Sequence, residues 1–434
     1  MGEDAFAEQE PAGTASVSAA EASAVGAAAG RPTLLLTLTG RDRPGLTTAL
    51  FSALADHAVE VLDIEQVVVR GRLVLGVLLA PATGSDPHLA PVVAAAEKVA
   101  DDLDLDLEAS SGRGDSSARP ARRVVVTVLG SPLAPESVAG LTAEIAAAGG
   151  NIDTITRLAS YPVTSIRLKV SGADVAVLRE SLAVAASRLG VDIAVERAGL
   201  HQRATRLVVM DVDSTLVQGE VIEMLAEHAG VGAEVAAVTE AAMRGELDFE
   251  QSLRARVRLL AGLPLATIDE VRDAIVLTPG ARTFVRTLKR LDYRFAVVSG
   301  GFTQVTDHLV DELGLDYSAA NTLEVVDGRL TGGLVGPVID RAGKAEALRR
   351  FAEKAGIPVA QTVAIGDGAN DLDMIAAAGL GIAFNAKPVV RQAADAAVSS
   401  PYLDSVLYLL GISREDVEEA DLADGVRTPA PPLL

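Results

Sequence analysis

The chain has 434 residues, a length that predicts two or three domains, and 49% of them are hydrophobic although Trp is absent. Its formal net charge of −21 argues against general binding to nucleic acid or a membrane surface, since both need a large basic face. The absence of cysteine excludes disulfides, thiolate nucleophiles and Cys-ligated zinc, which fits the cytoplasm. We therefore expect a soluble α/β protein with cores of Val, Leu, Ile and Ala.

The first 30 residues show no pattern of a folded domain. Residues 1–30 are rich in Ala, Ser and Gly and carry acids where a secretory signal has basic residues, which predicts a disordered tail. Residues 31–110 then alternate between strand and helix patterns. Strands are predicted at 34–39, 61–69, 72–79 and, weakly, near Leu105, with helices at 46–54 and 89–103. The order is β-α-β-β-α-β.

A second unit repeats this order. Residues 110–119, rich in Ser, Gly and Arg, predict a linker to a unit at residues 121–200. In this unit strands are predicted at 124–129, 152–158, 165–170 and 191–196, with helices at 138–148 and 175–189. The pattern indicates an internal duplication.

The paired units resemble ACT domains, which are ferredoxin-like (α+β) modules that bind amino acids and regulate attached enzymes. The most specific string is the first strand-to-helix turn, GRDRPGL at residues 40–46, whereas the second turn, GSP at 130–132, lacks the Asp. The resemblance implies that an amino acid such as L-serine binds at these domains, and that the protein is a homodimer. The alternative that both loops are only tight turns stays open.

A different pattern starts at residue 205, where the apolar run 207–210 ends on Asp211 and Asp213. Two carboxylates at the carboxyl end of a buried strand point into one crevice, which is where open α/β sheets place their sites. One ionised carboxylate can attack phosphorus while the other protonates the leaving oxygen. Taken alone, the pair is equally typical of an Asp-rich helix cap.

Two further signatures follow. The strand predicted at 295–298 leads into Ser299, Gly300 and Gly301, whose hydroxyl and exposed backbone N–H groups can hold phosphate oxygens. Lys344 stands in a helical run at residues 344–350. A lone lysine on a helix usually faces solvent, so Lys344 is a candidate site residue only in combination with the other signatures.

The last signature is the most specific. The strand predicted at 363–365 leads into the string GDGAND, which contains Asp367, Asn370 and Asp371. Mg²⁺ prefers carboxylate and phosphate oxygens, and Asp367 at a strand end can supply one ligand.

In this order, the four signatures resemble the haloacid dehalogenase superfamily, over residues 205–400. The resemblance implies a Rossmann-like core in which Asp211 forms an aspartyl-phosphate and Asp213 donates and later accepts the proton. It implies that Lys344 and Ser299 stabilise the phosphoryl charge. It further implies that Mg²⁺ is held by the carboxylates of Asp211 and Asp367 and by the backbone carbonyl of Asp213. It implies that Asn370 forms a hydrogen bond with the substrate, and that Asp371 orients the metal site or Lys344.

Substrate choice is expected to lie in a helical cap, at about residues 219–289. Its strings GEVIE, from Gly219, and MRGELDFEQSLRARV, from Met243, resemble the phosphoserine phosphatases. That resemblance assigns Glu220 to the substrate ammonium and Arg256 to its carboxylate, with Met243 and Phe249 closing the pocket. It implies hydrolysis of O-phospho-L-serine as the last step of serine biosynthesis.

The phosphatase domain is expected at residues 205–413, followed by a C-terminal tail at 414–434 that frays. Two rival interpretations stay open. One is a phosphatase for another small phosphomonoester, and the other is an amino-acid sensor whose phosphatase half is an inactive scaffold.

Overall fold

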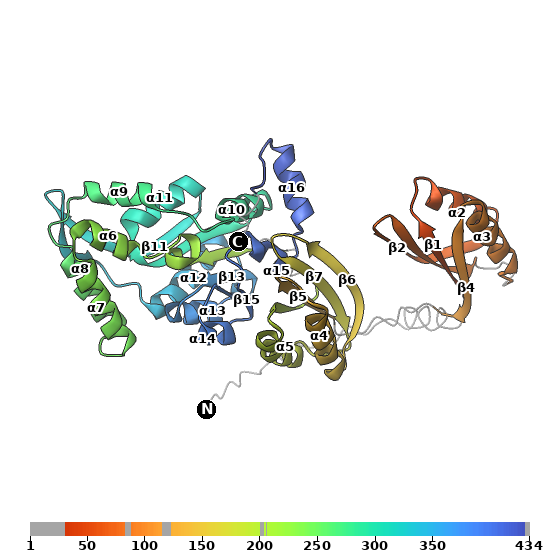
Figure 1. Cartoon of the computed structure of the whole chain (residues 1–434), viewed down its shortest axis with the longest axis horizontal. Helices are drawn as coiled ribbons and strands as arrows, with labels where there is room; N and C mark the ends of the chain where they lie inside the picture. Colours follow the sequence, from red (N-terminus) through yellow and green to blue (C-terminus); the bar gives the residue numbers. More distant parts are fainter. Residues whose placement is uncertain (1–30, 83–87, 115–122, 200–203, 205, 430–434) are drawn as a thin grey trace, which may run out of the picture. The chain divides into compact units, whose positions relative to one another are not determined.

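The computed structural model describes residues 31–82, 88–114, 123–199, 204 and 206–429 (Figure 1). The chain divides into two compact units, Met1–Arg119 and Pro120–Leu434. The predicted N-terminal tail, residues 1–30, lies outside the described residues. None of the helices in the described ranges is both long and apolar enough to cross a membrane.

The first unit is a ferredoxin-like domain. Its elements are β1 (Pro32–Arg41), α2 (Leu46–Leu54), β2 (Val59–Val69), β3 (Arg72–Pro81), α3 (Ala90–Asp102) and β4 (Leu105–Arg113). The described strands form one antiparallel sheet in the order β2-β3-β1-β4. Alternate residues of β1, including Leu36 and Leu38, are buried in one core with Leu50 of α2 and Ala96 of α3. The β-α-β-β-α-β order predicted from the sequence is confirmed.

The predicted linker at 110–119 begins too early. Residues 110–113 belong to β4, where Ser110 lies opposite Leu35 and Arg113 opposite Pro32 of β1. Ser and Gly are poor strand formers, but the backbone groups of β1 provide a complete ladder for them, and tertiary pairing overrides propensity. Residues 115–119 lie outside the described residues.

The second unit begins with a domain of the same topology. Its elements are β5 (Arg123–Gly130), α4 (Pro135–Ala147), β6 (Asn151–Ala159), β7 (Thr164–Ser171), α5 (Val175–Leu189) and β8 (Asp192–Arg197). The strand order β6-β7-β5-β8 repeats that of the first unit. Asp174 caps the start of α5 by accepting a hydrogen bond from the Ala176 amide, and Gly190, in the left-handed region, caps its end.

The C-terminal core is built on a mainly parallel sheet. Its strands are β9 (Leu207–Met210), β10 (Arg294–Phe302), β11 (Tyr317–Val326), β12 (Arg329–Val335), β13 (Thr362–Gly366), β14 (Leu380–Phe384) and β15 (Ala396–Val398). Their order within the described residues is β12-β11-β10-β9-β13-β14-β15. An antiparallel contact of Ala396 with Ala194 joins β15 to β8. The two domains of the second unit therefore share one continuous sheet.

Helices cover both faces of this sheet, as the Rossmann-like prediction requires. They are α10 (Ala281–Arg290), α11 (Thr303–Leu313), α12 (Arg341–Ala355), α13 (Leu372–Ala377), α14 (Pro388–Ala393) and α15 (Val406–Leu409). Leu207 and Val209 of β9 pack with α12, α13 and α14, while Val208 and Met210 pack with α10, α11 and α15. Because β9 is buried on both faces, its sequence is a continuous apolar run.

The helical cap consists of α6 (Val221–Ala229), α7 (Gly232–Met243), α8 (Phe249–Leu259) and α9 (Ala266–Ala274). The predicted cap, about 219–289, also contains most of α10. That helix packs on the core instead, with Phe284 edge-on to Phe295 of β10 at 5.8 Å between ring centroids.

The prediction that the chain frays from residue 414 is wrong for residues 414–423. They form α16 (Arg414–Ala423), which begins with reciprocal hydrogen bonds between Ser413 and Asp416. Asp421 is fully buried and pairs with Arg286 at 2.6 Å and Arg290 at 2.7 Å. These two arginines hold the pKa of Asp421 down, at about 2, against the effect of burial. Residues 430–434 lie outside the described residues.

Candidate active site

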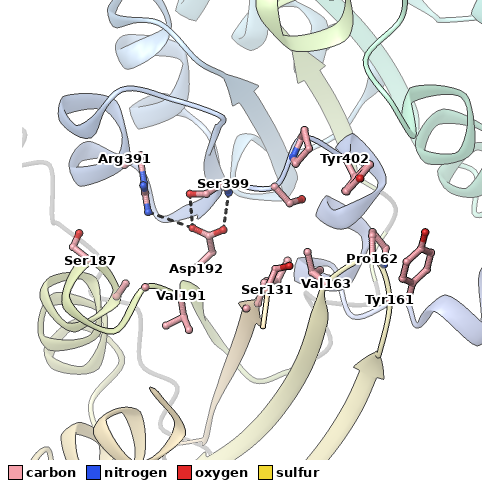
Figure 2. A pocket seen from close by; sticks show the side chains of 16 residues that line it. Ser131, Tyr161, Pro162, Val163, Ser187, Val191, Asp192, Arg391, Ser399 and Tyr402 are labelled. Carbon is pink, nitrogen blue, oxygen red and sulfur yellow. Dashed lines mark hydrogen bonds and ion pairs between the residues drawn. The ribbon is translucent and has the colours of Figure 1, made fainter. Parts of the chain in front are cut away.

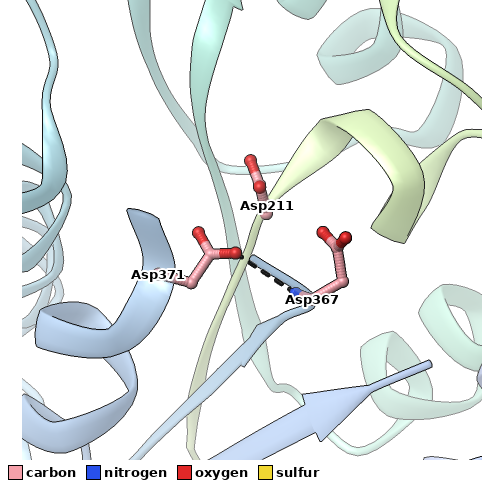
Figure 3. Close-up of side chains that lie close together, drawn as sticks. All are labelled: Asp211, Asp367 and Asp371. Atoms are coloured by element: carbon pink, nitrogen blue, oxygen red, sulfur yellow. Dashed lines mark hydrogen bonds between the residues drawn. The ribbon is translucent and has the colours of Figure 1, made fainter. Parts of the chain in front are cut away.

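Three parallel strands bring predicted site residues to one edge of the sheet. β9 lies between β10 and β13 and pairs in parallel with both. Asp211 follows β9 directly, Asp367 follows β13, and Ser299 lies near the end of β10. Figure 3 shows the carboxylates of Asp211, Asp367 and Asp371 gathered at this edge.

Lys344 is the buried cation of this site. It lies in the first turn of α12, whose start is fixed by the Asp340 side chain accepting from the Gly343 amide at 2.8 Å. The Lys344 side chain has no exposed surface, and its Nζ lies 2.8 Å from Asp211 Oδ1 and 2.7 Å from Asp371 Oδ1. Burial by itself lowers the pKa of Lys344, but the two carboxylates raise it above its usual value. The ammonium is therefore charged and fixed beside Asp211.

Asp371 holds the loop after β13 in place. While its Oδ1 contacts Lys344, its Oδ2 accepts from the amides of Asp367, at 3.2 Å, and Gly368, at 3.0 Å. A Cβ at Gly366 would lie 2.5 Å from this carboxyl group, so the close approach needs glycine. Both oxygens of Asp371 are engaged by protein groups.

The three carboxylates are suited to a divalent cation. One oxygen from each of Asp211, Asp367 and Asp371 lies within 4.8 Å of the others. Burial raises the pKa of Asp211 well above its usual value, and Asp371 adds to this while Lys344 opposes it. Burial and Asp371 likewise raise the pKa of Asp367 to about 6. Crowded, desolvated carboxylates are stabilised by a hard cation with oxygen ligands, and Mg²⁺ fits them.

The carboxylate of Asp213 lies outside that cluster and faces the other side of the site. Its Oδ1 accepts from the Val221 amide at 2.8 Å, and its Oδ2 accepts from the Ser299 hydroxyl at 3.0 Å. The Ser299 oxygen in turn accepts from the Gly301 amide at 2.7 Å. Ser299 thus fixes the orientation of the second carboxylate of the D-x-D pair.

The two glycines after Ser299 leave room where a side chain would not fit. A Cβ at Gly301 would lie 3.0 Å from Asp213 Oδ2 and 2.9 Å from Ser299 Oγ. A Cβ at Gly300 would lie 3.0 Å from the ring of Phe249, which reaches over from the cap. The two glycines lie in the irregular end of β10, where the sequence predicted a turn after the strand, and the backbone there approaches the site closely.

Sequence reasoning missed two residues that support the site. The buried Asn321 donates to the Gly300 carbonyl at 2.8 Å and accepts from the Ile339 amide at 2.7 Å, and so holds the irregular end of β10. Thr215 donates from its hydroxyl to Asp367 Oδ1 at 3.2 Å. Thr215 directly follows the D-x-D-S string, so its position could have indicated a site role. Asn321 belongs to no local sequence pattern.

Glu220 of the cap lines the same cavity as the carboxylates of Asp213 and Asp367. The Ser214 hydroxyl donates to its Oε1 at 3.3 Å, in a turn where Ser214 has a φ of 57°. Burial, and then the charges of Asp213 and Asp367, raise the pKa of Glu220 to about 7. A cationic group on the substrate would relieve this unfavourable charge.

Arg256 is the cation of the cap. Asp248 and Gln251 form a capping box that fixes the start of α8. Arg256 lines the site, while Arg254 and Arg258 are exposed. Burial lowers the pKa of the Arg256 guanidinium although Glu220 opposes this. Its Nε is buried without a hydrogen-bond partner in the described structure, so this donor is unsatisfied in the ligand-free site.

A cavity of about 280 Å³ joins these groups. The predicted residues that line it are Asp211, Asp213, Glu220, Phe249, Arg256, Gly300, Gly301, Asp367 and Asn370. Ser299 and Lys344 lie behind this lining, fully buried. Lys387, at the start of α14, and Val389 also line the cavity and were not predicted. The side chain of Met243, predicted to close the pocket, lies outside the described residues.

Comparisons with known proteins agree with this architecture. Residues 208–376 match the haloacid dehalogenase-like hydrolase family, and residues 32–110 and 123–196 each match an ACT domain. Phosphoserine phosphatase of Streptomyces coelicolor is 62% identical over 91% of this chain and 96% of its own length. Phosphoserine phosphatase of Mycobacterium tuberculosis is 52% identical over 91% of this chain and 97% of its own length.

A solved structure supports the same assignment. The unliganded crystal structure of a probable phosphoserine phosphatase from Vibrio cholerae superposes with a TM-score of 0.54 at 36% identity, over 69% of this chain and 88% of that one. The fold prediction, a Rossmann-like haloacid dehalogenase core with two ferredoxin-like ACT domains, is confirmed. The chain belongs to the phosphoserine phosphatase family, within the haloacid dehalogenase-like hydrolases.

Proposed function

We propose that this protein hydrolyses O-phospho-L-serine to L-serine and phosphate, as the last step of serine biosynthesis. The observation that carries the proposal is the pair of opposite charges in the cap, Glu220 and Arg256, in one cavity with Asp211. A carboxylate and a guanidinium match the ammonium and carboxylate of an amino acid. The identity of the relatives supports the same substrate.

The proposed reaction passes through an aspartyl-phosphate. A carboxylate oxygen of Asp211 bonds to phosphorus while the bond from phosphorus to the serine oxygen breaks, and Asp213 supplies the proton that serine takes. Water then attacks the phosphorus, Asp213 accepts its proton, and phosphate leaves with Asp211 restored. The hydrogen bond from Ser299 and the amide of Val221 hold Asp213 in position for both steps.

The surrounding groups are assigned to the phosphoryl oxygens. The ammonium of Lys344, at 2.8 Å from Asp211, is placed to stabilise charge that develops there. We assign Asn370 and the backbone at Gly300, which line the cavity, to hydrogen bonds with the substrate. We assign Ser299 to the phosphoryl group through Asp213, the carboxylate that its hydroxyl holds in place.

Mg²⁺ is the proposed cofactor. We assign it to Asp211, Asp367 and the backbone carbonyl of Asp213, because both oxygens of Asp371 are held by Lys344 and backbone amides. When bound, it supplies positive charge that screens the repulsion between a carboxylate nucleophile and an anionic phosphate. Asp371 then acts by positioning Lys344 and the loop.

A substrate panel tests the proposal. With Mg²⁺ present, kcat/KM for O-phospho-L-serine is expected to exceed that for phosphothreonine by about tenfold or more, because an added methyl group must fit the cavity. Sugar phosphates, which lack both charges, should be poorer still. Arg256→Lys should raise KM by about 10- to 100-fold through loss of charged hydrogen bonds, while the exposed Arg254→Lys control should not. Equal rates across the panel would refute the substrate assignment, and activity unchanged by chelation would refute the Mg²⁺ assignment.

The pH profile gives an independent check on Glu220. Because its pKa is about 7, it loses its proton, and gains the charge that attracts an ammonium, only as the pH rises through that value. Mg²⁺ bound at Asp367 offsets part of the negative charge that raises this pKa, so we expect kcat/KM, which reports free-enzyme groups, to rise with pH on a limb centred at or below 7. Glu220→Gln should lower kcat/KM and remove this limb. Exposed Glu227→Gln on the same helix is the control, and an unchanged limb in Glu220→Gln would contradict the assignment.

Regulation, assembly and location are proposed from the ACT domains and the family. An amino acid such as L-serine is proposed to bind at the ACT domains and alter turnover. A homodimer in the cytoplasm is proposed as the working form. Exposed apolar side chains on the edge strand β2, including Val67 and Val69, support association between copies.

A further inference from the structure

The loop after β14 leaves the sheet at the same edge as the catalytic loops. β14 pairs in parallel with β13, so the residues that follow it lie at the edge of the sheet where Asp367 follows β13. Asn385 turns the chain there with a φ of 50°, and its amide donates to the Val398 carbonyl at 2.8 Å. Lys387 comes two residues later, directly before α14, and lines the catalytic cavity.

The backbone of Lys387 is fixed, while its ammonium has no partner in the described structure. Its carbonyl accepts from the amides of Val390 at 3.0 Å and Arg391 at 3.1 Å, and Pro388 begins α14. Val390 is fully buried and anchors this short helix in the core. The Lys387 side chain is exposed and makes no cap hydrogen bond, and the described residues form no ion pair with it. The side chain can therefore meet a ligand in the cavity without breaking a contact.

The neighbouring cations already have partners or another assignment. The buried ammonium of Lys344 is shared by two carboxylates, at 2.8 and 2.7 Å. Arg391, on α14, is directed at Asp192 of the second ACT domain, at 3.4 Å, and lines a separate cavity (Figure 2). Arg256 of the cap is assigned to the substrate carboxylate. Among the described residues that line the catalytic cavity, Lys387 is the cation that the proposed reaction does not use.

The lining of the catalytic cavity is otherwise acidic. Two described cations, Arg256 and Lys387, stand against four carboxylates, those of Asp211, Asp213, Glu220 and Asp367. With all four ionised, Mg²⁺ would offset two of them, so the lining is neutral only when Lys387 is counted. A phosphomonoester carries nearly two negative charges at pH 7, and the whole chain carries −21. A cation at the exposed edge of the cavity therefore lowers the electrostatic cost of bringing such a dianion in.

We propose that Lys387 is a substrate-binding residue whose ammonium contacts the phosphate dianion at the exposed edge of the cavity. Lys387 belongs to the core, like Asp367, whereas Arg256 belongs to the cap. This arrangement favours the phosphate for Lys387 and the amino-acid carboxylate for Arg256. The contact is present in the bound substrate and in the transition state, so it lowers KM and leaves kcat nearly unchanged. The kinetic consequence rests on the proposed function, whereas the affinity for phosphate does not.

Substitution of Lys387 tests the contact through KM. Lys387→Met keeps most of the side-chain length and should raise KM for O-phospho-L-serine about three- to tenfold at low ionic strength, with kcat within about twofold. The difference should shrink to less than about twofold near 1 M KCl, where the Debye length is about 3 Å. Lys387→Arg should keep KM within about twofold of the wild type because it keeps the charge. Lys354→Met, which removes an exposed charge of α12 outside the cavity, is the matched control and should leave KM unchanged.

A second compound identifies the anionic group that Lys387 meets. O-phosphoethanolamine carries the phosphate and the ammonium of phosphoserine but lacks its carboxylate, and its binding is measured as turnover or as competitive inhibition. The factor lost in Lys387→Met should be the same for both compounds, whereas the effect of Arg256→Lys should be absent with phosphoethanolamine. A Lys387→Met effect that disappears with phosphoethanolamine would place Lys387 on the carboxylate and overturn the phosphate assignment.

Calorimetry with inorganic phosphate separates this inference from the proposed function. On the full chain with Mg²⁺, phosphate should bind Lys387→Met about three- to tenfold more weakly than the wild type, and Lys387→Arg and Lys354→Met like the wild type. If phosphoserine is not hydrolysed but phosphate binding still depends on Lys387, the proposed function is refuted and the inference stands. Equal phosphate affinity and equal KM in the wild type and Lys387→Met, or losses that Lys387→Arg shares, would overturn the inference and leave the hydrolysis of phosphoserine standing.

Discussion

Replacing Asp211 with Asn is expected to lower kcat by at least about a thousandfold, equivalent to ~4 kcal/mol of activation free energy. An amide is not a nucleophile for phosphorus, so the aspartyl-phosphate cannot form. The amide oxygen can still accept the hydrogen bond that Val212 donates to Asp211 at 2.8 Å. Phosphoserine should therefore bind the variant with little change, because Glu220 and Arg256 are untouched.

The stability of Asp211→Asn shows whether a loss of turnover comes from the missing nucleophile or from misfolding. Burial and Asp371 make the ionised form of Asp211 unfavourable, and Lys344 keeps its second partner, Asp371, in the variant. Without Mg²⁺, Asp211→Asn should therefore unfold at the wild-type temperature or higher. The control is Asp373→Asn, whose partly exposed pair with Arg341 contributes little, so turnover should stay within about twofold. Residual turnover within tenfold of the wild type, after mass spectrometry excludes deamidation, would contradict the proposed nucleophile.

The strands that carry the site were predictable because their signals are local. A strand buried on both faces is a continuous apolar run, and residues 207–210 were predicted as the strand that the structure contains. Asp211 and Asp367 directly follow the apolar runs of β9 and β13. Their place at the carboxyl edge of the sheet could therefore be predicted from the sequence. Arg256 was chosen through the resemblance to the phosphoserine phosphatases, because helical spacing shows only that Arg254, Arg256 and Arg258 cannot all face one way.

Features that depend on distant partners could not be predicted this way. The α16 helix has a local start signal at Ser413, but its stability depends on Asp421 reaching Arg286 and Arg290, more than a hundred residues earlier. Asn321 bridges two loops through its side chain and has no sequence pattern of its own. The antiparallel pairing of Ala396 with Ala194 joins β15 to β8 and so links two domains. Nothing in the sequence around either alanine predicts this pairing.

Lys344→Met is expected to damage stability and turnover together. The substitution nearly preserves side-chain volume but leaves Asp211 and Asp371 buried without the cation that contacts both. Breaking a buried ion pair by removing one partner costs about 3–5 kcal/mol in the free energy of unfolding. Turnover should fall by about a hundredfold or more, because a charge beside the phosphoryl group is lost. Urea unfolding and steady-state kinetics measure the two effects.

The sign of the pH dependence identifies the cause. Lys344 lowers the pKa of Asp211, so its removal raises the folded-state pKa of that carboxyl further above the unfolded value. A carboxyl with a raised folded pKa contributes stability at low pH that is lost as the pH rises. The variant should therefore be less destabilised at pH 5 than at pH 8.

A second substitution distinguishes the charge from the packing. Adding Asp371→Asn to Lys344→Met removes one uncompensated carboxylate, so the double variant should recover part of the lost stability without recovering turnover. Lys354→Met on the same helix is the control, since its ammonium lies over the Tyr317 ring at 4.8 Å and should contribute only about 0.5–1 kcal/mol. If Lys344→Met is destabilised equally at pH 5 and pH 8 and the double variant recovers no stability, Lys344 acts through packing, and the electrostatic basis for its role beside Asp211 is removed.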